Sequence, residues 1–470
     1  MASENPPIKS LKHTRSSDST IKPTFLKTTF PYRRKYLFNL NVQSLNSQLI
    51  KRNEALTWEF SGAHITENNA SFNRLANALR STKALQKLYL FCQWSFKVTD
   101  QGLLHLSYSL KRLASLQTIV IVIENGNQVT NTGLYYISQG LKELHSLQEL
   151  SLVFSRCSKV TNKGLYKISF GLRKLVYLQR FCLYVSENLN MTDKGVEILA
   201  RRLKNLVLLQ NLNLTFSACR HITDKSLEAL GQIFMKLTYL RDVSLRFSEC
   251  PNIISIGGIE KISEGLKILT HLRNLTLNFS ECNKVDCKWL CVVSQVLEKF
   301  PNLLICNLIF DQCEWINDQE MSVLCQGLKS LVALEGLILI FAGCAEVTDS
   351  NLEEIGESLE ECQSLQSVHF CFSGCVRITD KSFDFLMKGL KGAVGLRMVT
   401  LEFLDCPKIS DGGLKSLGEG LKKHLKLETV SLEFSTCSRV TMAGIEKVSK
   451  DLKAVNSFVD VSISLQDSGI

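Results

Sequence analysis

The chain has 470 residues, of which 45% are hydrophobic and 21% charged, and its formal net charge at pH 7 is +10. This length would suit about three ordinary domains, but no proline-rich linker divides the chain after residue 31. There is no run of about 18 apolar residues to span a membrane, and the first ten residues lack the apolar centre of a secretory signal. We therefore expect a cytoplasmic protein, with the nucleus as the alternative location, whose 17 cysteines are mostly reduced.

Positive charge is concentrated at the N-terminus. Residues 1–52 contain ten Lys and Arg but only two acidic residues, a net charge of +8 that leaves +2 for the other 418 residues. The first 30 residues hold ten Ser and Thr and show no apolar periodicity, which predicts a disordered basic tail over 1–36. The alternation of Phe38, Leu40 and Val42 predicts an N-terminal cap over 37–55. A nearly neutral body argues against nucleic acid as the partner.

A repeat of 31 residues fills the rest of the chain, 56–470. We number each repeat from the last apolar residue of its predicted strand, taken as position zero. These residues are Phe60, Cys92, Ile123, Phe154, Val185, Phe216, Phe247, Phe279, Phe310, Phe341, Phe372, Phe403, Phe434 and Leu465. Eleven of the thirteen intervals between them are 31 residues and two are 32, which indicates a true internal repeat.

Within each repeat, a strand pattern is followed by a helix pattern. Apolar residues at −4, −2 and 0 alternate as in a strand with one buried face, and those at +11, +14, +18 and +21 share one face of a helix. Thr at +7 and Asp or Asn at +8 are expected to cap that helix. A unit this small cannot bury its apolar side alone, so we predict an α/β solenoid of about 14 stacked repeats. Its parallel sheet should line the concave face of a horseshoe, and its helices the convex face.

Residues Cys219–Leu227 (CRHITDKSL) and Cys157–Leu165 (CSKVTNKGL) carry a resemblance to a known family. They resemble the cysteine-containing leucine-rich repeats, LxxLxLxxCxxITDxGLxxL, of F-box ubiquitin-ligase substrate receptors, and more distantly ribonuclease inhibitor. The resemblance covers 56–470, with two extra residues before the cysteine and a longer helix. It implies a leucine-rich-repeat horseshoe that binds a protein. No F-box pattern is found in the N-terminal region, so adaptor recruitment is not implied.

Nine cysteines occupy position +3. They are Cys157, Cys219, Cys250, Cys282, Cys313, Cys344, Cys375, Cys406 and Cys437. Neighbouring strands lie about 4.8 Å apart, which leaves disulfides open, but we expect buried thiols that donate weakly to loop carbonyls. Cys282, Cys287 and Cys291, with His271 upstream, lack the second cysteine pair of a typical zinc site, so we expect core packing there and no metal.

A row of basic residues falls in the last turn of the predicted helices. Its members are Lys111, Lys142, Arg173, Lys204, Lys267, Lys329, Lys391, Lys422 and Lys453. We expect them to offset the helix dipoles rather than to follow a phosphate backbone. The recurring Gly-Leu-Lys lies inside helices and is not a phosphate loop. No HExxH, GxSxG or paired-carboxylate pattern is present, so we expect no enzyme, no catalytic residue and no cofactor.

Positions −3, −1 and +1 alternate away from the core and predict the concave face. Exposed apolar and aromatic side chains in a row indicate an interface, although strand propensity alone could select Val, Ile and Tyr there. The predicted partner-binding residues are Tyr89, Phe91, Val120, Val122, Val153, Tyr184, Arg246, Ile309, Ile338, Ile340, His369, Glu402 and Glu433.

These observations predict a protein–protein interaction scaffold or recognition subunit that binds a protein partner on its concave face. A ubiquitin-ligase substrate receptor is the most specific form of this hypothesis. The alternatives are a leucine-rich-repeat enzyme inhibitor or GTPase-activating protein, or a structural component of a large cytoskeletal assembly. No small-molecule substrate is expected.

Overall fold

The computed structural model describes residues 56–61, 75–80, 82–92, 98–286, 288–455 and 459–464. All of them belong to one compact unit, Asn41–Ile470. The basic tail predicted over 1–36 and the cap predicted over 37–55 lie outside the described residues, so both stay predictions.

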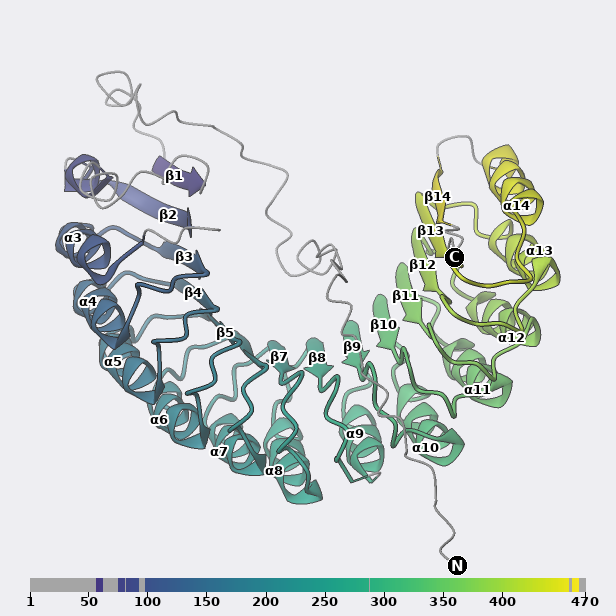
Figure 1. Ribbon diagram of the computed structural model, residues 1–470, viewed down its shortest axis with the longest axis horizontal. Helices are drawn as coiled ribbons and strands as arrows, with labels where there is room; N and C mark the ends of the chain where they lie inside the picture. The colour runs from purple at the N-terminus through teal and green to yellow at the C-terminus, as the bar shows by residue number, and fades with distance from the viewer. Residues whose placement is uncertain are drawn as a thin grey trace, which may run out of the picture. The chain divides into compact units, whose positions relative to one another are not determined.

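Fourteen strands form a single sheet in chain order, and each strand pairs in parallel with the next (Figure 1). The strands are β1 (Leu56–Ser61), β2 (Leu85–Cys92), β3 (Thr118–Glu124), β4 (Glu149–Ser155), β5 (Arg180–Ser186), β6 (Asn211–Ser217), β7 (Asp242–Arg246), β8 (Asn274–Asn278), β9 (Ile305–Ile309), β10 (Gly336–Ile340), β11 (Ser367–Cys371), β12 (Met398–Glu402), β13 (Thr429–Glu433) and β14 (Asp460–Ser464).

One helix connects each strand from β2 onward to the next and lies on the convex side (Figure 1). The helices are α3 (Asp100–Leu110), α4 (Asn131–Leu141), α5 (Asn162–Leu172), α6 (Asp193–Leu203), α7 (Asp224–Phe234), α8 (Ile256–Leu266), α9 (Trp289–Leu297), α10 (Asp318–Leu328), α11 (Asp349–Leu359), α12 (Lys381–Leu390), α13 (Asp411–Leu421) and α14 (Met442–Val455). The predicted leucine-rich-repeat solenoid is confirmed. Over the described part of the chain, none of these helices combines the length and the apolar character that a bilayer crossing requires.

The core is one continuous layer between the sheet and the helices. From β2 to β13, positions −4, −2 and 0 contribute to it, as the alternation predicted. From Phe216 to Phe434, the phenylalanines at position zero stack on one another with ring centroids 5.7–6.4 Å apart. Each ring is covered by the ring of the next repeat, so no repeat completes its own core.

The nine cysteines at +3 form a ladder of buried thiols. Each Sγ lies within hydrogen-bonding distance of the position-zero carbonyl oxygen one repeat earlier, as Cys250 does with Phe216 at 3.1 Å. The described cysteines are all free, so buried thiols are confirmed and disulfides between rungs are absent from this part of the chain. In one repeat Asn188 replaces the cysteine, and its Nδ2 donates to the carbonyl oxygen of Phe154 at 3.4 Å. A small buried donor therefore fills this position in every repeat from Cys157 to Cys437, whereas Gly126 occupies it in the β3 repeat.

The Asp and Asn residues at +8 join neighbouring repeats. In the Asp349 example, one carboxylate oxygen accepts from the backbone N–H of Thr379 at 2.7 Å, and the other accepts from the Thr379 hydroxyl at 2.6 Å. Ser382 also donates to Asp349. The same link to the following repeat is made by Asp100, Asn131, Asn162, Asp193, Asp380 and Asp411. The prediction that this residue caps its own helix was therefore wrong, whereas the Thr at +7 does cap its own helix in α4, α5 and α7.

The link changes in the middle of the solenoid. Ile254 and Ser255 stand where other repeats have Thr and Asp, and α9 has nine residues where most helices have eleven. Trp289 makes a contact between these two repeats instead: its indole N–H donates to the carbonyl oxygen of Ser255 at 3.1 Å. Its ring packs against Phe279.

The predicted core packing of the cysteine cluster is confirmed for Cys282, which is buried, while Cys291 is half-buried. Cys287 lies outside the described residues. Within the described ranges, no group of His, Cys, Asp or Glu could hold a metal ion.

The Gly-Leu-Lys glycines lie inside helices, as predicted, and permit close helix packing. A Cβ atom on Gly389 of α12 would collide with the backbone of Gly356 in α11. Gly265 and Gly327 likewise lie against backbone atoms of the preceding helix, whereas Gly140 and Gly420 lie against the side chains of Leu110 and Met387.

We predict that Asp349→Ala lowers the free energy of unfolding by about 2 kcal/mol, because it removes a charged acceptor and leaves the Thr379 N–H without its partner. The midpoint of urea unfolding, followed by circular dichroism, measures the effect. Glu353→Ala, at an exposed position of the same helix, is the control and should change stability by less than about 0.5 kcal/mol. Equal effects of the two substitutions would contradict the inter-repeat role.

We also predict that the ladder thiols resist alkylation in the native protein. Burial raises the pKa of Cys219 from 9.0 to about 12, which reduces its thiolate fraction near neutral pH about 1,000-fold. Labelling with iodoacetamide at about pH 8, followed by peptide mass spectrometry, should modify Cys291 first and the nine ladder cysteines only after unfolding in urea. Rapid native labelling of Cys219 would show that the ladder is not buried.

Candidate functional site on the concave face

All thirteen predicted partner-binding residues lie on β2–β13 at positions −3 or −1. None of them belongs to the core between sheet and helices. The parallel register places several of them side by side, because equivalent positions of successive repeats pair directly. The sequence therefore located the concave face correctly, and the binding role of these residues stays a prediction.

The N-terminal part of this face is apolar. Phe91, Val122, Val153 and Tyr184 follow one another in register across β2 to β5. Val122 and Val153 are only 4% and 5% exposed, as is Val120 at 5%, whereas the three aromatic residues Tyr89, Phe91 and Tyr184 are half-buried. The expectation of exposed valines was wrong. Valine is shorter than the aromatic side chains in register with it, so the aromatic residues form the accessible part of this surface.

The middle of the face is polar and holds one cation, Arg246 of β7. Its Nε donates to the hydroxyl of Ser244 at 3.3 Å, and burial lowers the pKa of its guanidinium. Electrostatic interaction with Tyr184 and Cys182 on β5 partly offsets this effect, because it raises the pKa of the Arg246 guanidinium. Burial raises the pKa of both. Cys182 lies at −3 of its strand, so the alternation that located the other residues also indicated this one.

A second apolar cluster, separate from the core, lies on β9 to β11. It consists of Ile309, Ile340 and Cys371, each 4–5% exposed, with Ile338 and Ala342 packed against them. Ile338 is half-buried and is the accessible member among the predicted residues. Cys371, at −1 like Ile340 in the preceding strand, and Ala342, at +1, occupy positions predicted to face the concave side, although neither was among the predicted partner-binding residues.

The C-terminal part of the face is acidic. His369 Nε2 and Glu402 Oε1 are 3.0 Å apart, and this hydrogen bond lowers the pKa of Glu402 even though burial opposes the shift. Glu433 pairs with Glu402 in register and accepts a hydrogen bond from the backbone N–H of Ser435 at 3.3 Å. Burial raises the pKa of Asp311, just beyond β9, and the charge of Glu402 adds to that effect. A cation brought to this region would relieve the repulsion between these carboxylates.

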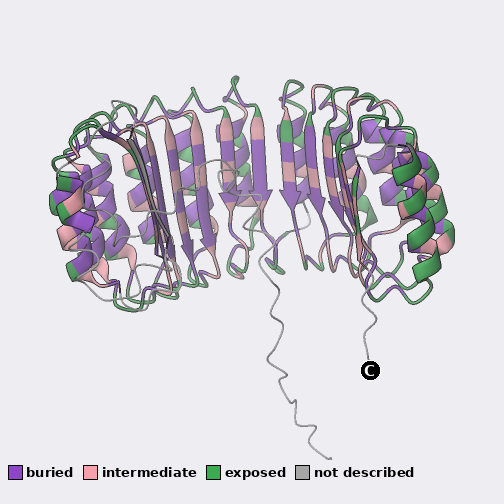
Figure 2. Cartoon of the chain, turned by 90° about the horizontal axis from the view of Figure 1, so that it is seen from above, coloured by how far each residue is buried: buried purple, intermediate pink, exposed green. Residues whose placement is uncertain are grey.

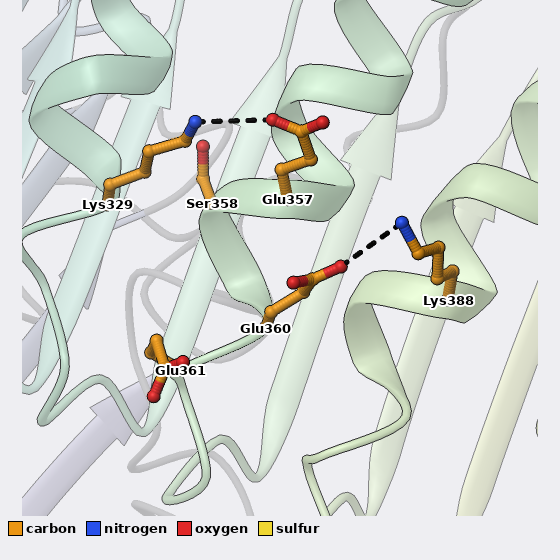
Figure 3. A pocket seen from close by; sticks show the side chains of 6 residues that line it. All are labelled: Lys329, Glu357, Ser358, Glu360, Glu361 and Lys388. Carbon is orange, nitrogen blue, oxygen red and sulfur yellow. Dashed lines mark hydrogen bonds and ion pairs between the residues drawn. The ribbon is translucent and has the colours of Figure 1, made fainter.

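A recess on the outer side of the solenoid lies between α10, α11 and α12 (Figure 3). The ion pairs Lys329–Glu357, at 3.2 Å, and Lys388–Glu360, at 3.4 Å, cross it. Ser358 also lines the recess, but its hydroxyl lies against backbone carbonyl oxygens of Cys325 and Glu354 at 3.0 and 2.7 Å. These contacts hold the hydroxyl in the helix packing and give it no activating base.

Comparison of the chain with protein-family models and with curated proteins finds no match. The role of the concave face is therefore argued from its own geometry and chemistry.

We predict a pH-dependent contribution of Glu402 to stability. Because its pKa is lowered in the folded state, its contribution is complete above the ordinary value of 4.5 and is lost as the pH falls through the lower folded value. The difference in urea midpoint between the unsubstituted chain and Glu402→Gln should therefore shrink as the pH falls from about 6 to about 3. A difference that stays constant over this range would contradict the His369–Glu402 interaction.

Proposed function

We propose that this chain is a protein-recognition scaffold that binds a protein partner along its concave face. The observation that carries the proposal is that large side chains line this face without taking part in the core. Those that are half-buried, and so available for contact, are Tyr89, Phe91, Tyr184, Arg246, Ile338, His369, Glu402 and Glu433.

The face suits a macromolecule better than a small ligand. Fourteen strands about 4.8 Å apart give a surface roughly 60 Å long at the sheet. The contact residues lie on paired strands over a continuous core, so little conformational freedom is lost when they meet a partner. Tyr and Arg are frequent among the residues that dominate binding energy.

The chemistry of the face suggests what the partner presents. The β2–β5 region offers aromatic side chains, and the β11–β13 region offers carboxylates next to an apolar cluster. We propose a partner with an apolar surface that meets the first region and basic side chains that meet the second. Complementary charge at the acidic end would fix the direction in which the partner lies.

The more specific hypotheses stay proposals of the same kind. A ubiquitin-ligase substrate receptor, an enzyme inhibitor, a GTPase-activating protein and a cytoskeletal component would all use a face like this one. They differ in the partner and not in the surface. The family suggested by the cysteine-containing repeat pattern is likewise a proposal, as is the absence of a catalytic role.

Quantitative affinity capture with the full-length chain tests the proposal. We predict that Tyr89→Ala with Phe91→Ala, and separately Glu402→Lys with Glu433→Lys, lower recovery of the same specific partner at least about ten-fold, as expected when residues central to an interface are lost. The control pair is Tyr108→Ala with Tyr166→Ala, which are 48% and 44% exposed on the convex helices. Equal recovery with the concave and convex variants, all shown to be folded by circular dichroism, would refute binding on the concave face.

A further inference from the structure

The loops that lead from each helix into the next strand lie along one edge of the solenoid unit, and the loops that leave the strands lie along the other (Figure 2). The basic row predicted from the sequence belongs to the first edge. Eight of its nine members are the C-terminal cap residues of their helices, and Lys453 lies in the last turn of α14. The predicted position near the negative ends of the helix dipoles is confirmed.

Charge is strongly segregated between this edge and the rest of the body. The helix-to-strand loops between α3 and β13, all within the described residues, are 111–117, 142–148, 173–179, 204–210, 235–241, 267–273, 298–304, 329–335, 360–366, 391–397 and 422–428. Together they contain seventeen Lys and Arg and six Asp and Glu, a net charge of +11. Residues 53–470 as a whole carry +2, which leaves −9 for everything else in the body. The nearly neutral total therefore conceals a strongly basic edge.

Four consecutive loops are both basic and apolar, and we name them the basic strip: 173–179, 204–210, 235–241 and 267–273. They contain seven Lys and Arg and no Asp or Glu. Each loop also exposes at least one large apolar side chain to solvent. These are Val176 (52% exposed), Tyr177 (59%), Val207 (48%), Leu208 (42%), Met235 (46%), Tyr239 (57%) and Ile268 (40%).

Two acidic residues next to the basic strip already have partners. Asp242, which follows the third loop, accepts hydrogen bonds from the side-chain amides of Asn211 and Asn274. On the helix before the fourth loop, Glu264 pairs with Lys261 at 2.7 Å. Six of the seven cations of the strip are exposed together with the apolar groups, and the seventh, Lys267, is half-buried. Lys267 and Arg273 also donate to uncharged oxygens, of Gln295 and Asn302, so neither is neutralised.

We propose that the basic strip binds the surface of a membrane that contains anionic phospholipids. Lys and Arg would meet the headgroup phosphates, and the aliphatic and Tyr side chains would enter the boundary between headgroups and acyl chains. Each cation near such a surface strengthens binding by about five-fold. Lys is depleted at protein interfaces, and Val, Leu and Ile cannot stack on nucleic-acid bases as aromatic residues do, so a bilayer fits this combination better than a protein or a nucleic acid.

Co-sedimentation of the full-length chain with vesicles tests this proposal. The vesicles contain either phosphatidylcholine alone or phosphatidylcholine with about 30% phosphatidylserine, the anionic lipid. We expect binding to the anionic vesicles only. Tyr177→Ser with Tyr239→Ser should lower the partition coefficient at least about ten-fold, because two apolar anchors are lost. Lys174→Glu with Lys236→Glu should lower it by at least as much, because each substitution reverses a charge.

Matched controls keep the test specific. Tyr108→Ser with Tyr166→Ser removes two tyrosines from the convex helices that are 48% and 44% exposed, against 59% and 57% for Tyr177 and Tyr239. Lys194→Glu with Lys225→Glu reverses two exposed charges in the first turns of α6 and α7, at the opposite edge. Both control pairs leave the basic strip unchanged and should bind vesicles within about two-fold of the unsubstituted chain. The basic tail is present in every variant, so its contribution is the same in all of them.

Equal binding by strip and control variants would overturn the proposal and assign vesicle binding to other cations. A second outcome would overturn the proposal in favour of nucleic acid. In that case the unsubstituted chain binds duplex RNA but not vesicles, and the strip variants lose the RNA binding. The concave variant Tyr89→Ala with Phe91→Ala should retain vesicle binding, so the outcome here is independent of the proposed protein-binding function.

Discussion

The structure depends on one constraint: each repeat can bury its apolar side only against its neighbours. The stacked phenylalanines at position zero satisfy that constraint, and each ladder thiol and each Asp or Asn at +8 reaches the adjoining repeat. All three contacts need the repeats to stay in register. The one-residue-longer interval between Phe247 and Phe279 keeps the ring stacking and the Cys282–Phe247 contact but changes the link at +8. A nearly constant repeat length therefore turns each position in the repeat into a row along the molecule.

Because equivalent residues of successive repeats form rows, some properties of the structure could be predicted from one repeat, and others depend on contacts between repeats. The strands, the helices, the concave positions and the buried thiols follow from the pattern within a single repeat. The link made by Asp349 was missed because its acceptor oxygens serve Thr379, 30 residues further on, and nothing inside one repeat indicates that contact. The low exposure of Val122 was missed for a related reason, since it depends on side chains contributed by neighbouring strands.

The net charge of the body was a poor guide to where charged surfaces lie, because their position also depends on how the repeats stack. Summed over the body, the cations and anions nearly cancel, and a sum contains no information about where each row lies. Cations at helix C-termini and acidic residues at helix N-termini are each favourable within one helix because of its dipole. Repetition then places all the favourable cations on one edge. Asp349, at the start of α11, and Lys391, at the end of α12, illustrate this separation of charge within adjacent repeats.

The two proposed surfaces can act independently because they use different positions of the repeat. Concave contacts come from −3 and −1, in the middle of each strand, whereas the basic strip comes from the loop before the strand. A bilayer against that edge would meet the ends of the repeats and leave the strand faces open to a partner. The basic strip lies beside β5 to β8, between the aromatic and the acidic regions of the concave face. It is confined to the loops before these strands, so a partner that runs along the strand faces from one region to the other leaves the strip uncovered.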